Sequence, residues 1–305
     1  MTGGAGFVGR HVTARALERG HEVTVLSRHP DRVDGLPDGV HLVAGDLTDP
    51  GRLRDALVDL ANAGQAPDAV VHAAAVVVDH DPKLHRVNVE GTGALCAALA
   101  ALPTPPRLVH ISTFAVEDIP ATEYSESKLA AEEVVRGSGL PHVVLRPSLV
   151  YGRGDGTNTP ALVEKMRQKT HWLPGGGRTL IQPVYVGDVA AACVAACERT
   201  DLSGGTYRLG GPEPVAVRAF REAVRDASGG SATIRPLPLG LLLFAAQGLA
   251  LLGKPRAKDV LAFHQADHRV DISEAASDLD FRPRPLDEGL SLTFGPEDVK
   301  ALRGG

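Results

Sequence analysis

Residues 2–9 read T-G-G-A-G-F-V-G, and the organisation of the chain can be predicted outward from this stretch. Gly3, Gly6 and Gly9 have the spacing G-x-x-G-x-x-G, which is typical of a turn from a β-strand into an α-helix. The glycines permit a tight turn, a close approach of the backbone to a bound group, and close packing of the helix on the sheet. Phe7 and Val8 open that helix, whose N–H groups and dipole favour an anion. The stretch therefore predicts a phosphate-binding turn of the kind that holds a dinucleotide.

The glycine-rich turn has an unusual start. Only Met1 and Thr2 precede Gly3, so the central strand that such a turn follows is absent from this sequence. Three explanations stay open. The start of the sequence is set too far downstream, tag residues replace the strand, or the sheet lacks its central member. The last would leave backbone groups of two neighbouring strands unpaired.

Beyond the turn, β-branched runs alternate with helical patterns. Strands are predicted at 21–27, 40–44, 69–73, 107–112 and 142–146, and helices at 7–19, 50–64, 84–101 and 123–136. Strands separated by helices of this length predict right-handed βαβ units and a parallel sheet. The strands are almost continuously apolar, as expected when helices cover both faces. We therefore expect an α/β protein with a doubly wound parallel sheet, a Rossmann fold.

The alternation loosens after about residue 150, where Pro and Gly clusters become frequent. One strong helix follows Asp188, and a short strand is predicted at 206–209. We expect a dinucleotide-binding domain over 1–149, to which 179–199 returns. A smaller α+β substrate lobe would comprise 150–178 and 200–305.

Composition restricts the class of protein. The 305 residues are 43% hydrophobic and 23% charged, which excludes a disordered or fibrous chain. A formal net charge of −5 provides no basic field, so no nucleic-acid partner is expected. Three scattered cysteines favour a reducing compartment, and we expect a cytoplasmic protein. His264 and His268 have a spacing that suits a metal on a helix, but no third ligand is near, so no metal is expected.

The segment 236–253 carries no charge and only just reaches the length of a membrane span. It contains prolines and glycines, so no transmembrane segment is expected. We interpret it as a buried helix or as the wall of an apolar pocket, with a membrane-surface helix as the alternative.

The end of the second predicted strand indicates which dinucleotide is bound. A carboxylate there accepts hydrogen bonds from the adenine ribose and selects NAD, but this sequence has Ser27 followed by Arg28, with Arg32 nearby. A missing acid and a guanidinium favour a 2′-phosphate, hence NADP, with NAD as the alternative. Asp46 and Leu47, after the third strand, are expected to flank the adenine.

The reacting groups are predicted from a Tyr–Lys pair. Tyr124 and Lys128 lie four apart at the start of a predicted helix and therefore share a face. A phenol is a poor base at neutral pH, and a nearby ammonium lowers its pKa. Ser112 and Thr113 end a predicted strand, where a hydroxyl can bind a substrate oxygen beside the phenol.

The motifs together resemble the extended short-chain dehydrogenase/reductase superfamily, the NAD(P)-dependent epimerase/dehydratase-like group. Besides the glycine-rich turn, the matching stretches are G-D-L-T-D (45–49), V-H-A-A-A (71–75), V-N-V-E-G-T (87–92), I-S-T (111–113), Y-S-E-S-K (124–128) and L-R-P-S-L-V-Y-G (145–152). The resemblance covers essentially the whole chain and is nearest the hydroxysteroid dehydrogenase and dihydroflavonol reductase branch.

The resemblance implies a role for each matching residue. Thr113, with Ser112 as runner-up, would be the catalytic hydroxyl, Tyr124 the general acid/base, and Lys128 the modifier of its pKa and a ribose ligand. Further cofactor-site residues would be Ala73, Ala74, Asn88, Pro147 and Ser148. Sugar-nucleotide dehydratases carry an acid pair after the catalytic Thr, but Phe114 and Ala115 stand here, so that elimination is not expected.

Three functions follow as hypotheses. The first is an NADP-preferring oxidoreductase that interconverts a secondary alcohol and a ketone, with a bulky apolar small molecule as substrate. The second is a nucleotide-sugar epimerase with retained NAD, which needs cations such as Arg153, Arg178 and Arg208 for a diphosphate. The third is a non-catalytic NADP-binding regulator, which has little need of the Tyr–Lys pair. A homodimer through helices that flank the sheet is compatible with the resemblance, although the sequence shows no interface.

Overall fold

The computed structural model describes residues 1–117, 121–156, 158–238, 240 and 267–295. The chain forms two compact units. Unit 1 comprises Met1–Ser148, Val186–Leu209 and Ile272–Arg282. Unit 2 comprises Leu149–Tyr185, Gly210–Asp271 and Pro283–Gly305.

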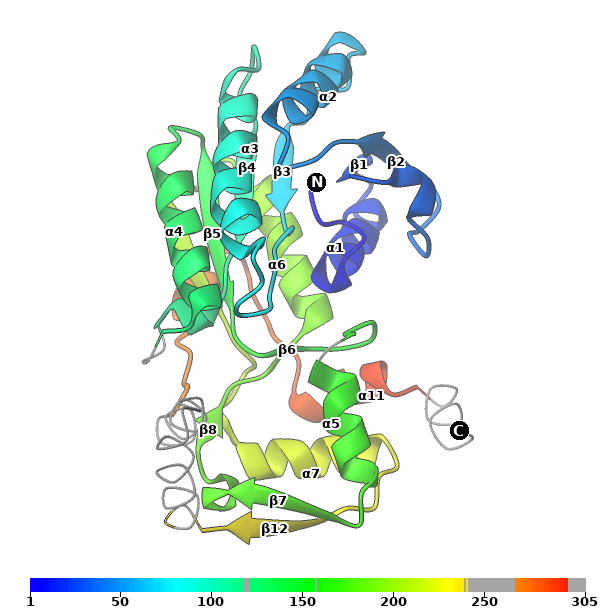
Figure 1. The fold of residues 1–305 in the computed structure, drawn as a ribbon, viewed down its shortest axis with the longest axis vertical. Helices are drawn as coiled ribbons and strands as arrows, with labels where there is room; N and C mark the ends of the chain where they lie inside the picture. Colours follow the sequence, from blue (N-terminus) through cyan, green and yellow to red (C-terminus); the bar gives the residue numbers. More distant parts are fainter. Residues whose placement is uncertain (118–120, 157, 239, 241–266, 296–305) are drawn as a thin grey trace. The chain divides into compact units, whose positions relative to one another are not determined.

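Unit 1 is a parallel sheet with helices on both faces, which confirms the predicted Rossmann architecture (Figure 1). One group of strands has the order β10-β5-β4-β3, and β1 pairs with β2. All of these pairs are parallel. The strands are β1 (Val23–Ser27), β2 (Val40–Ala44), β3 (Ala69–His72), β4 (Arg107–Ile111), β5 (His142–Pro147) and β10 (Gly205–Leu209). The helices are α1 (Phe7–Glu18), α2 (Pro50–Asn62), α3 (Gly91–Ala100), α4 (Glu123–Gly137), α6 (Val186–Glu198) and α10 (Ser273–Asp278).

The two faces of this sheet have separate helical layers. On one face, α2, α3 and α4 contribute Leu53, Leu99 and Val135 to a core that also contains Val70 of β3 and Leu108 of β4. On the other face, α1 packs against α6, and α6 contacts β3, β4 and β5. Burial on both sides explains why the strand sequences are apolar throughout rather than alternating.

The predicted helix at 84–101 is divided. It is α-helical at residues 84–85, passes through a π-helical turn, η2 (Arg86–Glu90), and continues as α3. Periodicity could not separate the two, since a π-helical turn inserts a residue without ending the helical run. Asn88 lies in this turn and is buried.

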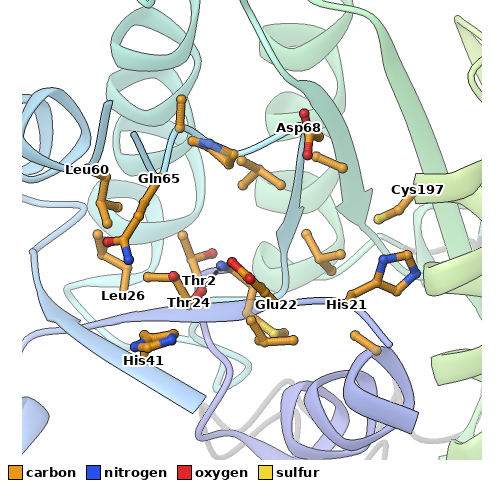
Figure 2. A pocket seen from close by; sticks show the side chains of 18 of the residues that line it. Thr2, His21, Glu22, Thr24, Leu26, His41, Leu60, Gln65, Asp68 and Cys197 are labelled. Carbon is orange, nitrogen blue, oxygen red and sulfur yellow. Dashed lines mark hydrogen bonds between the residues drawn. The ribbon is translucent and has the colours of Figure 1, made fainter. Parts of the chain in front are cut away.

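The first two residues of the chain lie between β1 and β3 (Figure 2). Thr2 forms parallel bridges with Leu26 of β1 and with His72 of β3. The N–H of Thr2 donates to Val71 O (3.0 Å), and the N–H of Ala73 donates to Thr2 O (3.1 Å). Thr2 is thus a single link between β1 and β3, and it leads directly into the glycine-rich turn.

The division of the chain differs from the predicted one at its later boundaries. The segment that rejoins unit 1 is Val186–Leu209 rather than 179–199, and Ile272–Arg282 also belongs to unit 1. The reason is strand pairing, because β10 lies parallel to β5 with Tyr207 opposite Leu145. The Tyr207 hydroxyl then donates to Asp278 Oδ2 (3.0 Å), which holds α10 to the same unit.

Unit 2 is a small α+β assembly with its own core. Tyr151, Met166, Leu173 and Phe220 are buried in it. Its pairs are β6 with β9, β7 with β12 and β8 with β11. The strands are β6 (Val150–Tyr151), β7 (Thr170–Pro174), β8 (Leu180–Ile181), β9 (Val184–Tyr185), β11 (Val215–Ala216) and β12 (Thr233–Leu237), and the helices are α5 (Asn158–Arg167), α7 (Val217–Ala227) and α11 (Leu286–Thr293).

Two sequence predictions fall mainly outside the described residues. These are most of the uncharged segment 236–253 and the histidine pair, of which only His268 is described. None of the helices in the described ranges has the length and apolar character needed to cross a membrane. The described residues also contain no group of three or more His, Cys, Asp or Glu side chains that could hold a metal ion.

Candidate active site

The predicted site residues all belong to unit 1, and most follow the carboxyl ends of its parallel strands. Ser27 ends β1, and Thr113 and Ser148 follow β4 and β5 directly or after one residue. Carboxyl ends of parallel strands meet at one edge of a sheet, which is where doubly wound folds bind their ligands. The structure thus places residues that are far apart in sequence along one edge.

The glycine-rich turn fits a pyrophosphate. Gly3 has φ of +69°, and a Cβ there would lie 2.5 Å from the backbone N of Ala74. A Cβ on Gly9 would lie 2.0 Å from Gly3 O. Gly6 is the N-cap of α1 and provides no side chain to cap its N–H groups. Any side chain at these positions would fill the turn, so the backbone is exposed to an anion at a helix N-terminus. Phe7 and Val8 are half-buried in the first turn of α1, as predicted.

The end of β1 carries the residues that were predicted to choose the cofactor. Arg28 is exposed and forms no hydrogen bond or ion pair with any residue in the described ranges. Asp46 accepts from the N–H and the hydroxyl of Thr48, both at 2.9 Å. Burial raises the pKa of Asp46, but the hydrogen bonds from Thr48 and the charges of Arg28 and Arg86 together outweigh this effect. The net result is a lowered pKa. Leu47 is 9% exposed and packs in the core, so its side chain is less available to an adenine ring than predicted.

The side chain of Asn88 links the loop after β3 to helix α4 through hydrogen bonds. Its Oδ1 accepts from the N–H of Val76 (2.8 Å), and its Nδ2 donates to Val76 O (2.9 Å) and to Ser127 Oγ (3.0 Å). Ala73 and Ala74 lie just before this loop, against Gly3. A second link is the N–H of Tyr124, which donates to Asp79 Oδ1 (2.8 Å). These bonds fix the start of α4 relative to the glycine-rich turn.

Thr113 and Tyr124 are brought together by the turn after β4 and the first turn of α4. Burial raises the pKa of Tyr124 to about 12, and its hydrogen bond with the Thr113 side chain acts in the opposite direction. The Thr113 Oγ1 also accepts from the N–H of Ala115 (3.2 Å). The two hydroxyl groups therefore form a pair in which the phenol stays protonated at neutral pH.

Ser112 has a different environment from Thr113. It is 4% exposed, and its hydroxyl donates to Glu132 Oε1 (2.5 Å). Glu132, which is fully buried, also accepts from Arg146 (2.9 Å to Oε1, 2.6 Å to Oε2) and from Arg136 (2.7 Å). The single hydroxyl proton of Ser112 is therefore used in the hydrogen bond to Glu132, whereas the Thr113 hydroxyl pairs with Tyr124.

Lys128 lies one turn after Tyr124 on α4 and is directed into the interior. It is 2% exposed, and its Nζ is 3.3 Å from Nε2 of His110 on β4. Burial lowers the pKa of Lys128 to about 8, and the charge of Glu132 opposes this shift. His110 in turn lies beside His72, with ring centroids 5.2 Å apart.

The protonation of His72 follows from its partners. Thr92 uses its hydroxyl proton on Asn88 O (2.6 Å), so it accepts from Nε2 of His72 (2.9 Å). Nδ1 of His72 then accepts from the Thr2 hydroxyl (2.7 Å). Burial and the charge of Lys128 lower the pKa of His72 to about 3, which agrees with a neutral ring.

Sequence reasoning missed two members of this neighbourhood. Neither His110 nor Glu132 was singled out from the sequence. A signal for Glu132 was present, because Lys128, Glu132 and Arg136 follow at intervals of four and so share a helix face. The partners Ser112 and Arg146 lie on two different strands, and no local spacing connects them to the helix.

Known proteins similar to this chain point to its family. The NAD dependent epimerase/dehydratase family matches residues 1–210. A 4-hydroxy-2-methyl-3-oxo-4-farnesyl-3,4-dihydroquinoline-1-oxide ketoreductase of Stigmatella aurantiaca is 29% identical, over 83% of this chain and 79% of the relative. A 3-beta-hydroxysteroid dehydrogenase of Mycolicibacterium neoaurum is 29% identical, over 75% of this chain and 69% of the relative. The crystal structure of the Thermus thermophilus UDP-glucose 4-epimerase complex with NAD superimposes with a TM-score of 0.73 at 27% identity, over 100% of this chain and 98% of that one.

The doubly wound sheet, the glycine-rich turn and these relatives define a Rossmann-fold oxidoreductase that uses a nicotinamide cofactor. The chain belongs to the NAD dependent epimerase/dehydratase family, and the resemblance stated from its motifs is confirmed.

Proposed function

We propose that the chain is an NADP-preferring oxidoreductase that interconverts a secondary alcohol and a ketone, with Tyr124 as general acid/base. The observation that carries this proposal is the Thr113–Tyr124 hydroxyl pair, in the same unit as the glycine-rich turn. The nicotinamide cofactor supplies or accepts the hydride. The protein supplies the proton and the donors that stabilise charge on the substrate oxygen, which are the larger part of such catalysis.

In this proposal each side chain has one task. Thr113 donates its hydroxyl proton to the substrate oxygen and orients it. Tyr124 delivers its proton to the same oxygen when a ketone is reduced. Because burial raises the pKa of Tyr124 to about 12, the phenol holds the proton that reduction needs at neutral pH. Lys128 lies one turn further along the helix and is the group whose charge stabilises the phenolate after transfer.

The preference for NADP is supported at the end of β1. Ser27 stands where a carboxylate would accept from the ribose of NAD, and Arg28 is exposed beside it. A guanidinium binds a 2′-phosphate through charge-assisted hydrogen bonds. A bulky apolar substrate is supported by the relatives, since one acts on a farnesylated quinoline and another on a hydroxysteroid.

The alternative is an epimerase that retains NAD, which the match to the UDP-glucose 4-epimerase favours. Arg208, one of the cations considered for binding a diphosphate, is already paired with a carboxylate. Its Nε donates to Glu117 Oε1 (2.8 Å) and Oε2 (3.0 Å). This pairing makes the reductase the better supported of the two.

The test is a screen of bulky ketones with NADPH and with NADH, using the chain and its Tyr124→Phe variant. We expect NADPH-dependent reduction and a loss of roughly 10²–10⁴-fold in kcat for the variant, since general acid catalysis contributes about that much. The Kd for NADPH should change little, because the ring remains. Turnover by the Tyr124→Phe variant at the original rate, or purification with tightly bound NAD, would contradict the proposal.

A further inference from the structure

Helix α7 of unit 2 carries three arginines on one side, Arg218, Arg221 and Arg225. They follow at intervals of three and four residues, and side chains with this spacing share a helix face. Nη2 of Arg218 donates to Ile234 O of β12 (3.4 Å). Nη1 of Arg225 donates to Ala232 O, just before β12 (3.4 Å). The face is thus directed toward the sheet of β7 and β12 (Figure 1), and the three guanidinium groups occupy similar surroundings.

The two outer arginines of this face each have a carboxylate partner on α7 itself. Nε of Arg218 donates to Glu222 Oε1 (2.9 Å). Nε of Arg225 donates to Asp226 Oδ1 (2.8 Å). The positive charge of each outer guanidinium is therefore matched within the same helix.

The central arginine differs from its neighbours. Arg221 is half-buried and forms no ion pair with a carboxylate in the part of the chain that the structure describes. Burial lowers the pKa of Arg221, and no negative charge acts against this shift. A guanidinium keeps its charge in proteins, so its hydration is partly lost here without a compensating anion. Arg221 thus has an unmatched charge between two matched ones.

The hydrogen bond that Arg221 does form within the described ranges is to a histidine. Its Nη1 donates to Nε2 of His171, which lies on β7 and is buried. A guanidinium can only donate, so Nε2 carries the lone pair and the ring is neutral. Burial and the charges of Arg221 and Lys165 lower the pKa of His171, which agrees with a neutral ring. His171 therefore orients the guanidinium without compensating its charge.

The opposite edge of the guanidinium is left without an acceptor. This edge consists of Nε and Nη2, whose N–H bonds form the fork that binds two oxygens of one anion. Among the described side chains, the nitrogens that are unpartnered and also sealed from solvent belong to Arg107, His110 and His142. Nε and Nη2 of Arg221 are not in that set, so solvent reaches them. The fork is therefore both unused and accessible.

A second positive charge lies nearby. Lys165 of α5 is exposed and acts on His171 with the same sign as Arg221. The neighbouring carboxylate, Glu164, is 3.8 Å from Arg167 rather than paired with Lys165. A carboxylate ligand would bring one negative charge, whereas a phosphate group carries about 1.5 to 2 at neutral pH. Two unmatched cations and a bidentate fork therefore favour a phosphate group.

We propose that Arg221 is the centre of a phosphate-binding site in unit 2. Two phosphate oxygens accept from Nε and Nη2 of Arg221, His171 holds the guanidinium in position through Nη1, and Lys165 adds charge. The phosphate is a free ion or a group on a small molecule, since both present the same oxygens to the fork.

The experiment is a titration of the chain with inorganic phosphate, followed by NMR at the Nε–H group of Arg221. The signal is assigned by its absence from the Arg221→Gln variant. We expect a saturable shift with a Kd on the order of 1 mM, and none with sodium chloride at equal ionic strength. The Nε–H of Arg225, which already donates to Asp226, is the internal reference and should shift little.

Variants then test the role of the fork, with the backbone amide of His171 as the reporter. Arg221→Gln should raise the Kd for phosphate at least about tenfold. Arg221→Lys keeps the charge but lacks the fork, so it should raise the Kd by roughly fivefold, and it serves if Arg221→Gln does not fold. Arg225→Gln is the matched control on the same helix face, and its Kd should equal that of the parent.

Glycerol phosphate distinguishes the two sources of the phosphate group. Tighter binding of glycerol phosphate than of inorganic phosphate would assign the site to a phosphorylated small molecule, and the reverse order would assign it to the free ion. The proposal is overturned if the Arg221 signal does not shift, if chloride produces the same shift, or if both Arg221 variants bind phosphate as the parent does.

Discussion

Nζ of Lys128 on α4 lies 3.3 Å from Nε2 of His110 on β4, and both side chains are buried in unit 1. Nδ1 of His110 has no hydrogen-bond partner among the described residues. If Lys128 is charged and donates to Nε2, the His110 proton must lie on this unpartnered Nδ1. The charged lysine is nevertheless costly, because the ammonium loses its hydration on burial.

This relationship predicts a pH-dependent stability. The pKa of Lys128 is about 8 in the folded chain, against an ordinary value of 10.5. Between these values the unfolded chain binds more protons, so the free energy of unfolding should rise with pH over that window. Below about pH 8 the cost of burying the charge is fully present.

The Lys128→Met variant should be more stable than the parent at neutral pH and should lack this rise. Urea unfolding from about pH 7 to about pH 10 measures both effects. Lys83→Met is the matched control because Lys83 is exposed. If the parent and Lys128→Met have the same slope, the buried amine is not the group that titrates.

The two neighbouring hydroxyl residues should separate into one that affects turnover and one that affects stability. Thr113→Val removes a donor beside Tyr124 and is expected to lower kcat by roughly 10²-fold. Ser112→Ala removes a buried bond to Glu132 and should cost about 1–2 kcal/mol of stability with a smaller effect on kcat. Steady-state kinetics and urea unfolding of both variants check this, and the opposite pattern would assign the catalytic hydroxyl to Ser112.

Glu132 should be a stabilising residue because its charge is matched inside the protein. Burial raises its pKa, but the hydrogen bonds from Arg146 and Ser112 outweigh this, and the net shift is downward. A carboxylate with a lowered pKa contributes stability above about pH 4.5, and this contribution is lost as the pH falls through the folded value.

Glu132→Ala should therefore cost roughly 1.5–3 kcal/mol at neutral pH, since it removes the buried carboxylate that accepts charge-assisted hydrogen bonds from Arg136 and Arg146. Glu133→Ala, on the adjacent exposed residue, is the control and should have little effect. Chemical unfolding of both variants gives the comparison. A similar loss in the two would mean that the buried cluster contributes no more than helix propensity.

Cofactor choice should depend on one arginine. We expect Arg28→Ala to raise the Kd for NADPH by roughly 10-fold or more and to leave that for NADH unchanged, because only NADPH carries the 2′-phosphate. Arg32→Ala is the control, since Arg32 is exposed nearby and lies 4.0 Å from Asp31. Cofactor fluorescence titration measures the Kd of each cofactor for the parent and for both variants. Equal losses for both cofactors would assign Arg28 a role other than phosphate recognition.

Much of the fold could be predicted because it depends on local patterns. The glycine spacing at Gly3, Gly6 and Gly9 and the alternation of apolar runs with helices predicted β1 to β5 to within two residues at each end. The position of Tyr124 and Lys128 on one helix face follows from the helical period alone. The order of these motifs was sufficient to indicate the family.

What the sequence by itself determined is thus the parallel sheet, the phosphate-binding turn and the set of candidate groups. Only the tertiary structure decided that Thr113 pairs with Tyr124 whereas Ser112 bonds Glu132, that Lys128 meets His110, and that β10 returns to β5. These features depend on contacts between residues far apart in the chain, and periodicity carries information only about neighbours within a few turns of helix or a few residues of strand.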